Sequence, residues 1–310
     1  MFHIMPSRIV SVCAGIGFIT GLGIATLGFA QGSVRKLEPS TGKFSCSRFQ
    51  WGADENSDKA IMRVPIGMNG KHYWYQFDTG ADVVAPYGAG EHRGWTTHGT
   101  WTRIPKVEFA GMSLPAILAI RMKNITDKSL QGTVGLDILV GHTLVIDFPK
   151  QRICMMNRAD LPDSVDEAAD WTRAEIRDGK FYIRAKLNGK KLDALLYDTG
   201  SSPDELSVDF DLWKEASGKA GANDASSRQH AQSLGEQVEI ISARATGDLV
   251  IGKHRYEHPR LSNIVSRPSS YHDNCFGAQG ALGNALFFNS IVILDLGAHP
   301  RFGIISLERA

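Results

Sequence analysis

The chain has 310 residues, of which 43% are hydrophobic and 22% are charged, so it has enough apolar material for a folded core and no sign of wholesale disorder. This length allows one large domain or two smaller ones. The 34 Lys and Arg residues nearly balance the 33 Asp and Glu residues, which argues against a nucleic-acid-binding surface.

Residues 1–30 have the pattern of an export signal. Arg8 provides a positive start, residues 9–29 carry no charge, and Gly28-Phe29-Ala30 offers small residues at the positions that a signal peptidase inspects. We expect cleavage after Ala30, an N-terminal extension over residues 31–58, and an exported protein that is periplasmic or secreted. The alternative is a retained membrane anchor, since about 20 apolar residues can span a bilayer.

Three cysteines follow the predicted cleavage site, namely Cys46, Cys154 and Cys275. An oxidising compartment permits one disulfide among them and leaves one thiol over. A bond between Cys46 and Cys154 would tie together the edges of the first repeat described below, but the sequence leaves the pairing open. Neither the cysteines nor the histidines have the spacing of a metal site, and we expect no metal and no cofactor.

The chain contains the same pattern twice. Asn69-Gly70-Lys71 recurs as Asn188-Gly189-Lys190, each time between runs of alternating apolar residues. Asn-Gly in this setting is a strong signal for a β-hairpin. Each predicted hairpin then leads into Asp-Thr-Gly, at residues 78–80 and at residues 198–200.

The two copies also end alike. Residues 132–139 correspond to residues 280–287, and an Asp follows twelve residues after Gly135 and again twelve residues after Gly283. Two motifs that recur in order and with matched spacing are much harder to attribute to chance than one. The sequence therefore predicts an internal duplication.

These matches divide the chain into a first copy over residues 59–157, a linker over residues 158–178 and a second copy over residues 179–310. The second copy is longer, and its surplus falls in residues 214–237, a polar segment that we expect to form a surface excursion. Most other segments are short, rich in β-branched and aromatic residues and bounded by Gly, Pro or Asn. This pattern predicts a mainly β fold.

Two Asp-Thr-Gly turns at matching places in a repeat point to shared chemistry. A single such turn is commonly only a loop feature. If the copies pack about a twofold axis, however, Asp78 and Asp198 meet there, and two neighbouring carboxylates that cannot easily both ionise share one proton. The ionised carboxylate can then take a proton from a water molecule while the protonated one polarises a substrate carbonyl.

Over about residues 59–307 the chain resembles the pepsin and retropepsin families of aspartic peptidases. Both copies have hydrophobic residues before Asp-Thr-Gly and a later apolar segment that ends in Gly, although Gln76 and Thr133 make the first match looser. The resemblance implies two retropepsin-like β-barrel lobes related by a pseudo-twofold axis, with Asp78 and Asp198 as catalytic residues. The other site residues that it implies are Thr79, Thr199, Gly80 and Gly200, which would support the catalytic pair, and Ala81, Asp82, Ser201 and Ser202, which would bind substrate.

Pepsins carry a tyrosine on a flap hairpin in the first lobe. The corresponding stretch of this chain, residues 94–104, has Trp95 and Trp101 but no tyrosine. We expect Gly99 at the tip of the hairpin and one of the tryptophans over the substrate. The alternative is that both tryptophans belong to the core.

The leading functional hypothesis is an aspartic endopeptidase that acts as a monomer on a peptide or protein substrate held between the two lobes. We expect no nucleic-acid partner, and membrane attachment only if residues 1–30 are retained. A second hypothesis is a catalytically silent peptide-binding module of the same fold, because a fold does not fix a function. A third is that each half pairs with the matching half of another chain.

Overall fold

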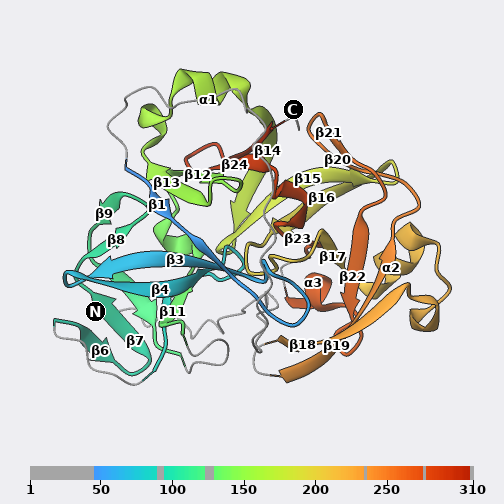
Figure 1. Ribbon diagram of the computed structural model, residues 1–310, viewed down its shortest axis with the longest axis horizontal. Coiled ribbons are helices and arrows are strands. Elements are labelled where there is room, and N and C mark those ends of the chain that lie inside the picture. The colour runs from blue at the N-terminus through green and yellow to red at the C-terminus, as the bar shows by residue number, and fades with distance from the viewer. Residues whose placement is uncertain (1–44, 89–93, 123–128, 234–235, 275–276, 308–310) are drawn as a thin grey trace, which may run out of the picture.

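The computed structural model describes residues 45–88, 94–122, 129–233, 236–274 and 277–307. The predicted export signal lies outside these residues, as does the first half of the predicted extension, residues 31–44. The described part is mainly β and forms three sheets of fifteen, seven and three strands. Figure 1 shows the first copy, coloured blue to green, on the left and the second copy, coloured yellow to red, on the right. In the described ranges, no helix is both long and apolar enough to cross a membrane.

The first thirteen strands, in chain order, are β1 (Ser47–Arg48), β2 (Gln50–Gly52), β3 (Ile61–Met68), β4 (Lys71–Phe77), β5 (Ala85–Pro86), β6 (Thr96–His98), β7 (Trp101–Ile104), β8 (Val107–Phe109), β9 (Met112–Leu114), β10 (Ile117–Ile120), β11 (Gly132–Val134), β12 (Thr143–Asp147) and β13 (Arg152–Met156). The remaining strands are β14 (Asp170–Arg177), β15 (Lys180–Leu187), β16 (Lys190–Tyr197), β17 (Leu206–Val208), β18 (Ser227–Ser233), β19 (Glu236–Arg244), β20 (Leu249–Ile251), β21 (His254–Tyr256), β22 (Arg260–Ile264), β23 (Gly280–Leu282), β24 (Ser290–Asp295) and β25 (Arg301–Ser306). The α-helices are α1 (Asp163–Ala168), α2 (Phe210–Ser217) and α3 (Ser270–Asn274), and short 3-10 turns are η1 (Leu136–Ile138), η2 (Arg158–Asp160), η3 (Ala222–Asp224) and η4 (Ala285–Phe287).

Both predicted Asn-Gly hairpins are confirmed. β3 and β4 pair across a turn at Asn69 and Gly70, whose φ angles are 52° and 72°. β15 and β16 pair across Asn188 and Gly189, whose φ angles are 51° and 81°. Two consecutive positive φ angles match the right-handed twist of a two-residue hairpin, and Asn followed by Gly tolerates them best.

The ends of the two copies are also equivalent in space. β11 runs parallel to β4, with Thr133 opposite Gln76. β23 runs parallel to β16 in the same register, with Ala281 opposite Leu196. This arrangement supports the end of each hairpin strand from the side, at the point where the Asp-Thr-Gly turn begins.

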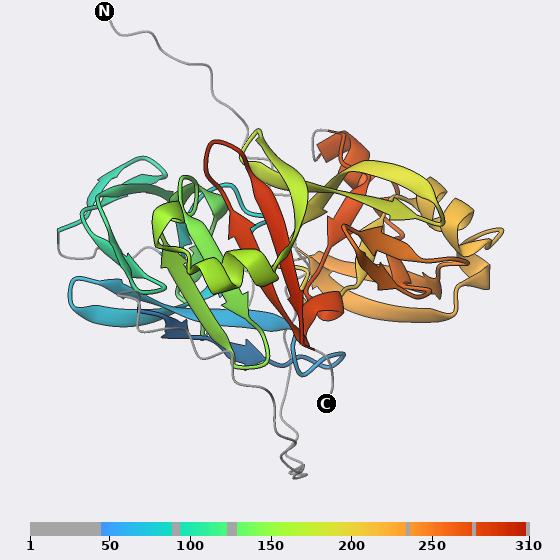
Figure 2. The same ribbon diagram turned by 90° about the horizontal axis from the view of Figure 1, so that it is seen from above.

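The two copies join edge to edge through β12 and β24. These strands pair antiparallel with Val145 opposite Ile293, two residues that occupy matching places in the repeat. The pairing is therefore symmetric about this residue pair, and β25 continues the sheet beyond β24. Figure 2 shows the green strands of the first copy beside the red strands of the second at the centre of the molecule.

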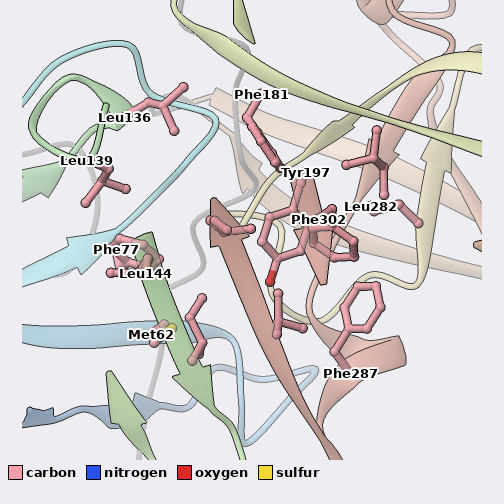
Figure 3. Close-up of a cluster of buried hydrophobic side chains, with 14 of the residues drawn as sticks. Met62, Phe77, Leu136, Leu139, Leu144, Phe181, Tyr197, Leu282, Phe287 and Phe302 are labelled. Atoms are coloured by element: carbon pink, nitrogen blue, oxygen red, sulfur yellow. The ribbon is translucent and has the colours of Figure 1, made fainter. Parts of the chain in front are cut away.

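The hydrophobic core runs without a break from one copy into the other. Phe77 and Tyr197, the residues that precede the two Asp-Thr-Gly turns, are both fully buried in the same cluster. Figure 3 shows them with core residues of both copies, including Leu144 on β12 and Phe302 on β25. Burial of this kind contributes about 25 cal/mol per Å² of apolar surface, so separating the copies would expose apolar side chains at a high cost in free energy.

The structure pairs Cys46 with Cys154, which is the pairing that the positions of these residues suggested. The bond lies where β1 pairs with β13, with Ser47 opposite Ile153. It ties the start of the described chain to the last strand of the first copy. Cys275 lies outside the described residues.

Two segments are more ordered than their composition indicates. In the predicted linker, Asp170–Arg177 form β14, which pairs with both β25 and β15. In the predicted surface excursion, residues 214–217 complete helix α2, and β18 pairs with β19 along its whole length. Polar residues adopt strand structure here because neighbouring strands supply the backbone partners, and such tertiary pairing overrides local propensity.

Candidate active site

The two Asp-Thr-Gly turns have the same backbone hydrogen bonds. The Asp78 N–H donates to the Val134 carbonyl at 3.1 Å, and the Asp198 N–H donates to the Leu282 carbonyl at 2.9 Å. Each turn therefore leaves its hairpin strand and is anchored at once on the parallel strand that ends the same copy. The position of both carboxylates follows from the duplicated strand pairing.

The carboxyl groups of Asp78 and Asp198 face each other across the junction of the copies. A methyl group added to Gly80 would lie 2.6 Å from Asp198 Oδ1, and one added to Gly200 would lie 2.6 Å from Asp78 Oδ1. Each glycine thus makes room for the carboxylate of the other copy, which no larger residue could do. A hydrogen bond joins the two carboxyl groups directly, and we call this pair the dyad.

Thr79 and Thr199 connect the turns beneath the dyad. The Thr79 N–H donates to Thr199 Oγ1 at 3.0 Å, and the Thr199 N–H donates to Thr79 Oγ1 at 3.1 Å. Each hydroxyl then donates to a carbonyl of the opposite strand end, Thr79 to Tyr197 at 2.6 Å and Thr199 to Phe77 at 2.9 Å. Four buried hydrogen bonds with both partners satisfied hold the two turns in fixed positions.

Burial governs the ionisation of the dyad. Asp78 is 7% exposed and Asp198 is 1% exposed. Burial raises the pKa of Asp78 well above its usual range, and the neighbouring Asp198 carboxylate raises it further. Burial also raises the pKa of Asp198, but the hydrogen bond that it accepts from Asp78 opposes this effect. These effects favour a pair that holds one proton, with Asp78 as the preferred carrier and Asp198 as the preferred site of the negative charge.

A serine adds to this asymmetry. The Ser201 hydroxyl donates to Asp198 Oδ2 at 3.0 Å, which lowers the pKa of Asp198 because the bond favours the ionised carboxylate. The matching residue in the first copy is Ala81, which has no hydroxyl to offer Asp78. Ser201 is fully buried, and its substrate-binding role, which the family resemblance implies, stays a prediction.

The side chain of Asn284 forms three hydrogen bonds that hold the second turn in place. Its side-chain oxygen accepts a hydrogen bond from the Tyr197 hydroxyl at 2.9 Å, and its amide donates to Ser202 Oγ at 3.1 Å and to the Thr199 carbonyl at 3.3 Å. Asn284 is not among the residues predicted from the sequence, although its place after Gly283, where the first copy has Leu136, is a visible difference between the copies. Ser202 is fully buried in this network, and its predicted role in substrate binding stays a prediction.

A lysine that is also absent from the predicted site lies beside the first turn. Lys180, the first residue of β15, has no exposed surface. Its ammonium donates to the Gly80 carbonyl and forms an ion pair with Asp82. This ion pair holds Asp82, a predicted substrate-binding residue, by a cation from the other copy. The side chain of Asp82 is 22% exposed.

The predicted flap region forms a hairpin. β6 and β7 pair across Gly99, whose φ of 61° is the left-handed conformation expected of a hairpin tip. Trp101 begins β7 and is 40% exposed, while Trp95 is half-buried and packs against the main core cluster. The structure thus confirms the turn position, and the role of either tryptophan in substrate binding stays a prediction.

A cavity of about 970 Å³ lies elsewhere, along β14 and the turn between β24 and β25. Trp171, Arg173, Tyr182 and Arg301 line it, and none of the predicted site residues does. It is not the site to which the sequence points. In the part of the chain that the structure describes, no three His, Cys, Asp or Glu side chains cluster so that they could hold a metal ion.

No protein-family model matches the chain, and no curated protein sequence matches it.

Proposed function

We propose that the protein is an aspartic endopeptidase in which Asp78 and Asp198 hydrolyse a peptide bond. The observation that supports this most directly is the reciprocal approach of each carboxylate to the Gly of the opposite turn, where a methyl group added to either glycine would lie only 2.6 Å from the facing carboxylate oxygen. Two buried carboxyl groups that share a hydrogen bond provide an acid and a base within reach of one water molecule. A purely structural turn would gain nothing from burying two such groups together.

The asymmetry of the dyad supports one division of the two catalytic roles. Asp198, the ionised partner, accepts a proton from a water molecule while the water oxygen attacks the carbonyl carbon of the substrate. Asp78 gives its proton to the carbonyl oxygen. When the tetrahedral adduct collapses, the C–N bond breaks, the leaving nitrogen takes the proton held by Asp198, and one hydroxyl of the adduct returns its proton to Asp78. The carboxylic acid and amine products then leave with the dyad again singly protonated.

The proposal extends to the fold. The matched hairpins, the matched parallel strands and the symmetric pairing of β12 with β24 favour two retropepsin-like lobes about a pseudo-twofold axis that passes near Val145 and Ile293. In this arrangement, one chain builds one complete active site between its own two lobes. The β6–β7 hairpin would be the flap of the first lobe.

We also propose export to the periplasm or the medium. The Cys46–Cys154 disulfide favours an oxidising compartment, and the uncharged segment over residues 9–29 has the length and composition of a signal. Mass spectrometry of the native protein tests this, because cleavage gives a mature chain that begins near Gln31. An intact N-terminus recovered with membranes would instead establish an anchor.

The peptidase test uses the mature protein and a diverse peptide library from acidic to neutral pH, with and without a statine-type transition-state analogue. We expect cleavage that the analogue blocks and that falls by at least about 10²-fold in Asp198→Asn, since acid–base catalysis is worth about 10²–10⁴-fold. Asp224→Asn is the control, because Asp224 is exposed and remote from the dyad in the sequence. Peptide binding without cleavage at any pH would favour the silent peptide-binding module.

A further inference from the structure

Lys180 is unusual because it is a fully buried lysine. Its side chain is 0% exposed, and burial of an ammonium is costly unless it is paired and hydrogen-bonded. Its partners are the Asp82 carboxylate and the Gly80 carbonyl. Both belong to the first copy, whereas Lys180 belongs to the second.

The hairpin between β14 and β15 delivers this lysine. Asp178 and Gly179 form its turn, with φ angles of 49° and 74°. A methyl group added to Gly179 would lie 3.5 Å from Asp82 Cβ, so the hairpin tip rests against the first turn. Lys180 is the next residue and reaches the loop that carries Asp78. The Gly80 whose carbonyl it holds also donates its N–H to Asp78 Oδ1 at 2.9 Å.

The repeat contains no second cation of this kind. Lys180 lies eight residues before Asn188, and the residue eight before Asn69 is Ile61. Asp82 lies four residues after Asp78, and the residue four after Asp198 is Ser202. The ion pair on one side of the dyad is thus replaced on the other side by an apolar residue and a serine, so the dyad experiences a one-sided positive charge.

We propose that Lys180 is a positioning residue of the dyad: its ammonium clamps the first Asp-Thr-Gly loop from the second copy, and its charge favours the singly ionised carboxyl pair over the fully protonated one. The consequence for turnover rests on the proposed peptidase function, but the effect on the carboxyl groups does not. The positive charge of Lys180 lowers the pKa of both Asp78 and Asp198, against the larger effect of burial. Removing the charge moves the range in which the dyad holds one proton to higher pH.

The other charges around Lys180 determine whether each variant raises or lowers the pKa values of the dyad. Burial raises the pKa of Asp82, while Lys180 lowers it, and Asp178 opposes Lys180 by raising it. Among the described residues, Asp137 and Tyr182 also interact electrostatically with Asp82, and Arg177 lies beside the ring of Tyr182. Asp82→Asn therefore leaves Lys180 less neutralised, and its effect on the dyad is opposite to that of Lys180→Met.

The experiment titrates the carboxyl carbons of Asp78 and Asp198 by ¹³C NMR in the substrate-free mature protein, in parallel with the pH profile of kcat/KM. We expect Lys180→Met to move both apparent pKa values of the pair upward by about one pH unit or more. Lys180→Arg keeps the charge and should titrate close to the wild type. Asp82→Asn should move the values downward.

The opposite shifts distinguish a charge effect from general damage to the fold, which would not reverse sign between variants. If Lys180→Met does not fold, Asp82→Asn still decides, because an unchanged or upward titration in that variant overturns the proposal. Unshifted values in a folded Lys180→Met protein overturn it as well. The NMR titration needs no substrate, so a failure of the proposed peptidase function appears separately, as absence of cleavage in every variant.

Discussion

Thr79 and Thr199 each accept a hydrogen bond from the backbone N–H of the other, at 3.1 and 3.0 Å, across 120 residues of sequence. Each hydroxyl also donates to the opposite strand end, so no polar atom of the exchange is left unpaired. The two turns cannot move apart without exposing or orphaning these groups. The distance between the dyad carboxylates therefore depends on the threonine pair as much as on the aspartates themselves.

We expect Thr199→Val to destabilise the protein by about 1–3 kcal/mol, because it leaves the buried Thr79 N–H without an acceptor and the Phe77 carbonyl without a donor. Thr199→Ser keeps the hydroxyl and should retain most of the stability and activity. Denaturant unfolding measures the difference.

Thr143→Val is the matched control for this loss of a hydroxyl. Thr143 is fully buried, and its Oγ1 has no hydrogen-bond partner among the described residues. Its replacement by valine should be neutral or stabilising. Equal losses in Thr143→Val and Thr199→Val would contradict the role assigned to the threonine exchange.

Asp78→Asn should make the protein more stable at neutral pH. Burial raises the pKa of Asp78 above the value of 3.8 that an unperturbed aspartate has, so the folded state binds this proton more tightly than the unfolded chain does. Stability is then lost as the pH rises from about 4 through the raised pKa. Asparagine cannot ionise and avoids this loss.

Thermal unfolding across pH 4–8 tests whether stability changes with pH in this direction. The gain in Tm of Asp78→Asn over the wild type should be largest at the alkaline end and should shrink toward pH 4, while activity is lost throughout. Asp224→Asn, at an exposed position, should show no such trend. A variant that is less stable than the wild type at neutral pH would mean that the buried dyad does not hold its proton as described.

The sequence identified the parts of this site that the duplication repeats, and it missed the parts that break the duplication. Asp78 and Asp198 were found because the same tripeptide follows the same hairpin twice. Lys180 and Asn284 were missed because their counterparts, Ile61 and Leu136, are unrelated to them in chemistry. A repeat predicts what its copies share, and an asymmetric contact across the junction appears only when the copies are packed together.

Substitutions at Ser201 and Ala81 test directly which carboxyl group of the dyad holds the shared proton. Ser201→Ala removes the hydrogen bond to Asp198 Oδ2, so the pKa of Asp198 rises and the acid limb of the kcat/KM profile moves to higher pH. A hydrogen bond to a charged group is worth about 1.5–3 kcal/mol, and one pH unit corresponds to about 1.4 kcal/mol. We therefore expect a shift of about one to two pH units.

The reverse substitution, Ala81→Ser, offers a hydroxyl to Asp78 at the matching place. It should stabilise the ionised form of Asp78 and move the alkaline limb of the profile to lower pH. Kinetic profiles measured on both variants with one peptide separate these limbs. Movement of the alkaline limb alone in Ser201→Ala would mean that Asp198, and not Asp78, holds the proton.

The pairing of the two copies within one chain can be tested by measuring activity and mass as the protein is diluted. β12 and β24 pair along five residues of each strand, and one core cluster spans both copies, so we expect the site to form within each molecule. Specific activity should then be constant on dilution, and sedimentation should give a monomer mass. An obligate dimer would lose activity as its concentration falls below the dissociation constant.

A mixture of Asp78→Asn and Asp198→Asn proteins is the sharper test. If copies paired between chains, the first copy of one variant and the second copy of the other would together supply both carboxylates, and the mixture would regain activity. Because each chain satisfies its own threonine exchange and its own β12–β24 pairing, we expect the mixture to stay as inactive as either variant, even after unfolding and refolding together at low concentration. Recovery of activity in the mixture would show that the active site is built by two chains.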